Sequence, residues 1–527
     1  MPFDAREATI DSVHHAVFSG LSTCREIVSA FIARIETLNK NTNAVITLNP
    51  RALDYADSLD ERLAAGNASG SLFCVPVLLK DNYDTEEMPT TGGSLRLADL
   101  HPTKDAPSVT ALKQAGAVIL GKTNMHELAL EGLGASSLGG QTINPYDHTR
   151  TAGGSSSGTG AAIGASFAVL GTGTDTVNSL RSPASANSLF SIRPSRGLIT
   201  TAGIIPVSYT QDTVGPIARS VRDVAVALTV MASTGYDPTY NFSAIVPASV
   251  SNIDYAAALT TGALKGLRLG VLKGFFNFTD APKVAPVNEA MNAMMQKLES
   301  AGAVLIPINE TLYDAAVIGA QLDVQRFEIR ELMDQYLQDT SRKGIYPKSF
   351  NEFYSKDTKD FLVIPAQYEY VNTALVSSTS NARYIARQNG IRNLTLALAS
   401  TFAGSKLDAI IYPEQKNLVV KLGSPSQAGR NGILAALTGS PVVTVPVGFS
   451  EPTEDAPVGV PIGMEILGLP WSEEKLLKIA YQIEQLTHIR KSPQWALEDV
   501  EVKDYKQMPV VRPDNTNIPK AYPLGTL

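Results

Sequence analysis

Residues 151–184 read TAGGSSSGTGAAIGASFAVLGTGTDTVNSLRSPA, in which two loops rich in glycine, serine and threonine flank the apolar residues 161–170. A Gly- and Ser-rich stretch can be a flexible linker, but residues 161–170 do not have a linker composition, and apolar residues border the second loop on both sides. Loops of this kind expose backbone N–H groups and hydroxyls, which are suited to hold an oxyanion. The stretch therefore predicts a helix of small residues over 161–170 and an oxyanion site beside it.

Outward from this stretch, short apolar runs alternate with segments of helical periodicity. Thr23 and Glu26 form a capping-box pattern, which opens a helix with apolar residues on one face. Because strands alternate with helices, the sequence predicts an α/β fold, with a mixed, mostly parallel, twisted sheet flanked by helices on both faces. The expected strands are 75–79, 117–120, 267–272, 304–306, 409–412 and 442–445, and the expected helices, besides 161–170, are 107–116, 220–231, 287–300, 431–437 and 473–485.

Further motifs accompany residues 151–184 on both sides. They are VPVLLKDN (75–82), MPTTGGS (88–94) and AGAVILGKTNMHE (115–127) upstream, and DTVGPIAR (212–219), VPVG (445–448) and PIG (461–463) downstream. Together these motifs resemble the amidase signature family, and the resemblance covers about residues 8–235 and 405–490. The resemblance implies a single large amidase-signature-type domain that hydrolyses the C–N bond of a carboxylic amide.

The resemblance also assigns three catalytic residues. The family's nucleophile falls on Ser179 and its lysine on Lys80, while its bridging serine, which has a cis peptide bond in the family, falls on Ser155. The separations of 75 and 24 residues are the usual ones in the family. Lysine has a pKa of about 10.4 in water, but burial at the end of the strand expected at 75–79 can make it neutral. Lys80 then accepts a proton from Ser155, which takes one from Ser179.

The same resemblance places an oxyanion hole at the backbone N–H groups of Thr176, Val177, Asn178 and Ser179. The family usually has Gly-Gly directly before the nucleophile, where this chain has Val177 and Asn178. Asn tolerates a positive φ better than most residues, whereas a β-branched Val resists it. Val177 is therefore the departure that the backbone path has to accommodate.

Charged residues near these loops are interpreted as structural. We expect Asp175 and Arg181 to form an ion pair that braces the second loop, and Asp212 and Arg219 to have a similar role. His126 is also expected to be structural, because no motif links a histidine to a serine and an acid.

The whole chain, residues 1–527, is expected to form one domain. Within it, 8–235 is the signature core, 240–400 a divergent helical region that shapes the substrate site, 405–490 a return to the core, and 500–527 an extended polar tail. We expect residues 240–400 to pack against the sheet, because strand–helix units lie on both sides of them.

Composition limits the partners and the cofactors. A net charge of −7 disfavours nucleic acid and anionic membranes as main partners. No apolar run approaches the length of a membrane span, so a soluble protein is expected, with a cytoplasmic location favoured and a secreted form with a removed signal peptide left open. We expect no metal and no organic cofactor, because no cluster of His, Cys and Asp has ligand spacing. Cys24 and Cys74 are too few for a disulfide framework, and Cys74 is interpreted as a small buried hydrophobic residue.

Four functional interpretations remain open on this basis. The first is a free-standing amidase that acts on a small-molecule or peptide-like amide, with a homodimer left open. The second is the A subunit of a tRNA-dependent amidotransferase, which has the same triad but needs partner subunits. The third is a biosynthetic acyl transferase of the same family. The fourth, a scaffold without activity, is suggested only by Val177 and Asn178.

Overall fold

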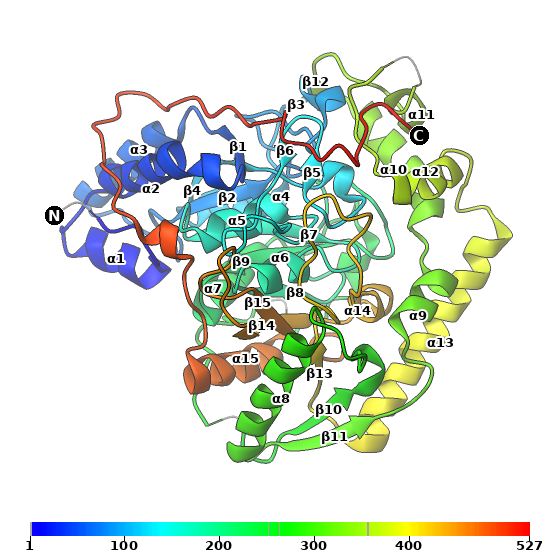
Figure 1. Ribbon diagram of the computed structural model, residues 1–527. Coiled ribbons are helices and arrows are strands. Elements are labelled where there is room, and N and C mark those ends of the chain that lie inside the picture. The colour runs from blue at the N-terminus through cyan, green and yellow to red at the C-terminus, as the bar shows by residue number, and fades with distance from the viewer. Residues whose placement is uncertain (1–2, 251, 263, 356–357) are drawn as a thin grey trace.

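The computed structural model describes residues 3–250, 252–262, 264–355 and 358–527. Within these residues, eleven strands form one mixed sheet (Figure 1). In spatial order they are β1 (Val45–Leu48), β4 (Val118–Thr123), β2 (Pro76–Lys80), β7 (Leu170–Asp175), β9 (Thr213–Ala218), β8 (Phe190–Arg193), β14 (Val442–Phe449), β15 (Pro461–Leu467), β13 (Ala409–Pro413), β10 (Arg268–Leu272) and β11 (Val304–Ile308). Two short ribbons pair β3 (His101–Pro102) with β12 (Arg342–Lys343) and β5 (Ala135–Ser136) with β6 (Gly140–Gln141).

Helices flank the sheet on both faces, which confirms the predicted single α/β domain with a mixed sheet (Figure 1). Parallel pairs form two groups, at β4–β2–β7 and β13–β10–β11, and antiparallel pairs join the two groups through the middle. The edge strand β1 pairs with β4 in the antiparallel sense. The helices are α1 (Ile10–Phe18), α2 (Cys24–Leu38), α3 (Ala52–Ala64), α4 (Pro107–Gln114), α5 (Ser157–Gly164), α6 (Arg181–Ala186), α7 (Val221–Ala232), α8 (Ala285–Ser300), α9 (Ala315–Leu322), α10 (Gln325–Gln338), α11 (Phe350–Phe353), α12 (Tyr368–Ala374), α13 (Ala382–Ser405), α14 (Ile433–Thr438) and α15 (Glu473–Thr487). No helix among the described residues is long and apolar enough to span a membrane.

The helix predicted over residues 161–170 is partly wrong. The helix α5 begins earlier and ends at Gly164, and Leu170 already begins the strand β7. The sequence of β7, LGTGTD, has no apolar alternation, so its strand character was not visible. Its glycines serve close packing, because a Cβ atom on Gly171 would lie 2.4 Å from the methyl group of Thr159 in α5. Small residues thus let α5 lie directly on the sheet.

The two cysteines also correct an expectation. Both are fully buried, as a small hydrophobic residue would be, but Cys24 and Cys74 form a disulfide with Cα atoms 5.4 Å apart. Cys24 is the first residue of α2 and follows the N-cap residue Thr23, whose predicted capping box with Glu26 is confirmed. Cys74 lies just before β2. The bond therefore ties the first turn of α2 to the entry of the strand that carries Lys80.

Breaking this disulfide is expected to lower the free energy of unfolding by about 2–4 kcal/mol, because it releases a closed loop of the unfolded chain. The measurement is urea unfolding of the parent with and without a reductant, beside Cys24→Ser. The double variant Cys24→Ser/Cys74→Ser is the control, and a reductant should not destabilise it. Equal unfolding midpoints for the parent in both conditions would contradict the expectation.

Residues 240–400 contribute to the common sheet and core. The strand β10 pairs with β13 in the sheet, and β11 pairs with β10. A second apolar cluster combines early and late segments, since Leu97 and Leu100 belong to it together with Met333 and Phe350. This part of the chain therefore shares its buried surface with the rest of the domain.

Limited proteolysis is accordingly expected to release no stable fragment that spans residues 240–400. Removing the segment would expose the edge of β13 and open the cluster around Leu97, so the remainder should lose its structure in the same step. The measurement is a protease time course followed by mass spectrometry. A fragment of this range that unfolds cooperatively on its own would show that the region is an independent domain.

Candidate active site

Lys80 ends β2, between the neighbouring strands β4 and β7, and is fully buried. Its Nζ lies 2.7 Å from Ser155 Oγ and 2.8 Å from Thr174 Oγ1. The Asn82 side-chain amide donates to the same Thr174 hydroxyl at 3.1 Å. The amine therefore has hydroxyl partners, which accept its hydrogen bonds without requiring it to be charged.

Burial lowers the pKa of Lys80 to about 7, against the opposing influence of the Asp175 and Asp212 carboxylates. Desolvation disfavours the charged amine, and neither carboxylate is hydrogen-bonded to it among the described residues. A large part of the lysine is therefore neutral near pH 7, as a proton acceptor has to be.

Ser155 precedes α5 and follows a tight glycine turn. Gly153 has a φ of 68°, and the peptide bond between Gly154 and Ser155 is cis. A Cβ atom on Gly153 would lie 2.7 Å from the carbonyl oxygen of Ser182, so only glycine fits. The backbone oxygen of Ser155 accepts a hydrogen bond from the N–H of His126 at 3.0 Å. These contacts fix the serine beneath the lysine amine.

His126 is buried, and burial lowers its pKa to about 4, so the imidazole is neutral at ordinary pH. Its Nδ1 accepts from the N–H of Ala135 at 3.4 Å. The structural role expected for this histidine agrees with both observations.

Ser179 lies in the loop between β7 and α6 and is 8% exposed. Its backbone oxygen accepts from Ser156 Oγ at 2.6 Å, which joins the two Gly- and Ser-rich loops. The backbone N–H groups of residues 176–179 donate to no protein atom among the described residues, whereas the next N–H, of Leu180, bonds Asp175 Oδ2 at 3.0 Å. The four predicted oxyanion donors are thus left without a protein acceptor.

The predicted ion pair of Asp175 and Arg181 is present and fully buried. Arg181 Nε lies 3.1 Å from Asp175 Oδ2, and Arg193 Nη1 lies 2.6 Å from Asp175 Oδ1. Arg181 also donates to the carbonyl oxygen of Val177 and, through Nη1, to Glu465 Oε2 at 2.8 Å. Burial would raise the pKa of Asp175, but the two guanidinium groups outweigh it and hold it at about 2. The loop before Ser179 is therefore anchored by fixed charges.

The two residues that replace the family's Gly-Gly fit the loop without strain, because neither Val177 nor Asn178 has a positive φ. The Asn178 side chain points to a carboxyl group of another segment, and its Nδ2 donates to Glu414 Oε1 at 2.9 Å. The backbone path thus does not need glycine at either position.

Asp212 and Arg219 brace the core separately and not as a pair. Asp212 accepts from Thr176 Oγ1 at 2.6 Å and from two backbone N–H groups of the 207–208 turn. Arg219 donates to the backbone oxygens of Ile163 and Ala168. Both are structural, as expected, but Asp212 supports the site loop itself.

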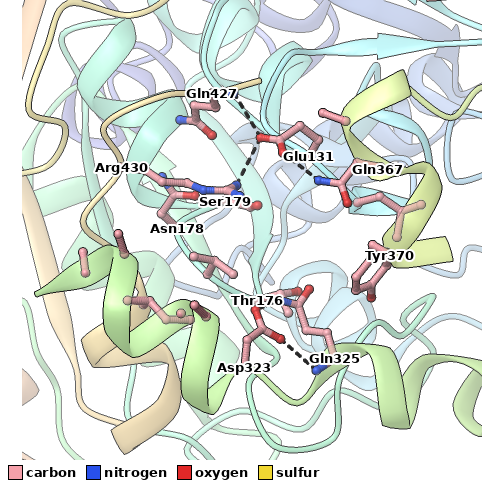
Figure 2. Close-up of a pocket in the computed structure, with 18 of the residues that line it drawn as sticks. Glu131, Thr176, Asn178, Ser179, Asp323, Gln325, Gln367, Tyr370, Gln427 and Arg430 are labelled. Carbon is pink, nitrogen blue, oxygen red and sulfur yellow. Dashed lines mark hydrogen bonds and ion pairs between the residues drawn. The ribbon is translucent and has the colours of Figure 1, made fainter. Parts of the chain in front are cut away.

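Ser179 opens into a cavity of about 610 Å³ (Figure 2). Its walls come from the 129–131 turn, α9, the start of α10, the start of α12 and residues 416–433. Arg430 Nη1 lies 3.1 Å from Glu131 Oε1, and Gln367 Nε2 donates to Glu131 Oε2 at 2.8 Å. Burial would raise the pKa of Glu131, but Arg430 and the backbone N–H of Gly132 keep it below the usual range. The cavity beside Ser179 therefore has a polar wall joined by an ion pair and a hydrogen bond.

Sequence reasoning missed this wall entirely. Glu131, Asp323, Tyr370 and Arg430 converge from four segments in Figure 2, and none lies in a motif. Only the general expectation that residues 240–400 shape the substrate site pointed toward Asp323 and Tyr370. No group of three or more His, Cys, Asp and Glu side chains suited to a metal ion occurs in the described part of the chain.

Comparison with known proteins identifies the family of the chain. The model of the family described as Amidase matches residues 26–477. The chain is 32% identical over 504 residues to the A subunit of the glutamyl-tRNA(Gln) amidotransferase of Geobacter metallireducens, covering 92% of this chain and 99% of that one. It is 30% identical over 503 residues to a putative amidase of Arthroderma benhamiae, covering 88% of this chain and 79% of the relative.

Among solved structures, the native peptide amidase of Stenotrophomonas maltophilia is similar, with a TM-score of 0.81 and 31% identity. The match covers 94% of this chain and 99% of the peptide amidase. A family match over most of the sequence, relatives matched over 79–99% of their length and a shared fold lead to one conclusion. The chain belongs to the amidase family of carbon–nitrogen hydrolases.

Proposed function

We propose that the protein hydrolyses the C–N bond of a carboxylic amide through an acyl-enzyme on Ser179. The observation that carries the proposal is the hydrogen bond of 2.7 Å between the fully buried Lys80 and Ser155. The loop of Ser155 is hydrogen-bonded to the loop of Ser179, and Ser179 lines a cavity. A serine hydroxyl needs a base to become a nucleophile. A lysine with a pKa of about 7 supplies one near neutral pH.

The proposed reaction begins with a proton relay from Ser179 through Ser155 to Lys80. Lys80 accepts the proton of Ser155 while Ser155 accepts that of Ser179, and Ser179 Oγ forms a bond to the amide carbon. The negative charge that develops on the carbonyl oxygen is received by the N–H groups of Thr176, Val177, Asn178 and Ser179. The relay then runs in reverse and protonates the leaving amine, and water releases the acyl group by the same route.

The substrate class proposed is a peptide-like or other small amide. A cavity of about 610 Å³ is within the range of small-ligand sites. Similarity to a peptide amidase over nearly the full chain supports this class. The mixed charges of Glu131, Asp323 and Arg430 favour a substrate with polar groups beside the scissile amide.

A second candidate is the A subunit of a tRNA-dependent amidotransferase, favoured by the full-length likeness to the Geobacter protein. The two candidates differ in whether the isolated chain turns over simple amides. Gel filtration of the purified chain followed by a panel of peptide amides tests this, and hydroxylamine added to the assay reports acyl transfer to an amine. No turnover without added subunits would favour the second candidate.

Replacement of Ser179 by alanine is expected to abolish acylation, whereas Ser155→Ala should retain a small residual rate. Ser179 forms the bond, while a proton relay contributes about 10²–10⁴-fold. The measurement combines the turnover rate with mass spectrometry of the trapped acyl-enzyme. Ser157→Ala is the matched control, because this serine of the same loop bonds Thr142 and not Lys80. An acyl group found on Ser155 or Ser156 would overturn the assignment.

The pH dependence reports on Lys80. Because the neutral amine is the base, kcat/KM should rise with pH through about 7, where the charged form gives way to the neutral form. Lys80→Ala should remove this limb and lower the rate by about 10²–10⁴-fold. Lys80→Arg should fail as well, since a guanidinium group stays protonated. If the Arg variant kept the rate and profile of the parent, Lys80 would be an electrostatic aid and not a base.

A further inference from the structure

Asn178, the neighbour of the proposed nucleophile, is held by a carboxyl group from a distant part of the chain. Glu414 follows β13, and its Oε1 accepts the Asn178 side-chain amide at 2.9 Å. The backbone N–H of Glu414 donates to the carbonyl oxygen of Gly463 at 3.0 Å, which fixes its position on the sheet. Glu414 is fully buried, and its second oxygen, Oε2, has no hydrogen-bond partner among the described residues.

Glu414 lies beside a buried group of charged side chains whose positive and negative charges are equal in number without it. Arg181 and Arg193 supply two positive charges, and Asp175 and Glu465 supply two negative ones, joined by ion pairs of 2.6–3.1 Å. No cation is paired with Glu414 in the described part of the chain. Ionisation of Glu414 would therefore place an unpaired negative charge in the protein interior, and burying such a charge costs free energy.

The groups around Glu414 also favour its neutral, protonated form. Burial raises the pKa of Glu414 to about 8, and the Glu465 carboxylate on β15 acts in the same direction. The hydrogen bond from Asn178 and the charge of Arg181 on α6 lower this pKa, whereas the Asp175 carboxylate on β7 raises it. Tyr412 on β13 stays neutral, because burial raises its pKa well above the usual value. Glu414 is thus neutral at pH 7 and begins to ionise just above it.

We propose that Glu414 is a positioning residue for the reaction: as a neutral carboxyl group it holds Asn178 and so keeps the N–H groups beside Ser179 aligned for the oxyanion. The inference rests on the proposed function of Ser179. When Glu414 loses its proton, a negative charge stands behind the loop in which the oxyanion forms, and the two charges repel. The rate should therefore fall as pH rises through about 8, which gives the pH profile a descending limb beside the ascending limb of Lys80.

The experiment compares Glu414→Gln with Glu414→Ala over pH 6–10 on the best amide of the panel. The glutamine keeps an oxygen acceptor for Asn178 but cannot ionise, so it should retain the ascending limb and lose the descending one. The alanine removes the acceptor and should lower kcat by about tenfold with little change in KM. Glu473→Gln is the matched control, because Glu473 is buried and its pKa is raised by burial, but it accepts from the N–H of Ser195. This variant should keep both limbs.

Asn178→Gly completes the test as a double-mutant cycle. If Glu414 acts through Asn178, adding Glu414→Ala to Asn178→Gly should lower kcat by much less than tenfold. The inference would be overturned if the reductions in kcat caused by Glu414→Ala and Asn178→Gly multiplied in the double variant. It would also be overturned if Glu414→Gln kept the descending limb of the pH profile. Failure of the proposed function looks different, because Ser179→Ala would then keep the parent's turnover. Near-ultraviolet circular dichroism of every variant identifies loss of folding.

Discussion

The site depends on an amine that is removed from water and yet not paired with a carboxylate. Lys80 ends a strand enclosed by β4 and β7, so the sheet itself desolvates its amine. Its hydrogen bonds go to Ser155 and Thr174, whose hydroxyls satisfy the neutral and the charged form alike. A carboxylate in direct contact would have kept the lysine charged. The absence of a direct contact between Lys80 and the Asp175 or Asp212 carboxylate, among the described residues, therefore matters as much as the contact with Ser155, because it allows the pKa of the lysine to stay low.

The second constraint is the group of buried charges behind the loop that carries Ser179. Asp175 at the end of β7 and Arg181 at the start of α6 are neighbours in the sequence, and Arg181 links them to Glu465 in β15, 284 residues further along the chain. Since all three side chains are buried and mutually paired, the loop between them has little freedom to move. In the proposed reaction the N–H groups of residues 176–179 gain from this rigidity, because donors that are held in place need no reorganisation when charge develops. The substitution of the usual glycines is tolerated for the same reason: the path is fixed by ion pairs and not by glycine conformations.

The sequence allowed much of this to be predicted, and the failures have physical causes. The α/β class, the capping box before Cys24 and the ion pair of Asp175 with Arg181 follow from local patterns. Lys80, Ser155 and Ser179 were selected by resemblance, and the structure brings the first two into contact. The strand β7 was missed because its sequence, LGTGTD, has no apolar alternation. Its glycines instead allow neighbouring segments to pack closely against the strand. The cavity wall of Glu131 and Arg430, and the contact of Asn178 with Glu414, join segments more than 200 residues apart and leave no local signal.

The strand order has a consequence for how the protein is made. The strand β8 ends at Arg193, but its neighbour β14 begins only at Val442, and Glu465 follows later still. All three residues of the proposed triad are therefore synthesised long before Glu465, the partner that anchors the loop of Ser179 through Arg181. During this interval the inner edge of β8 is an unpaired strand edge, which is prone to wrong pairing and a natural substrate for chaperones. The residues of the proposed triad are thus present during most of the synthesis, whereas the sheet around them is completed only near its end.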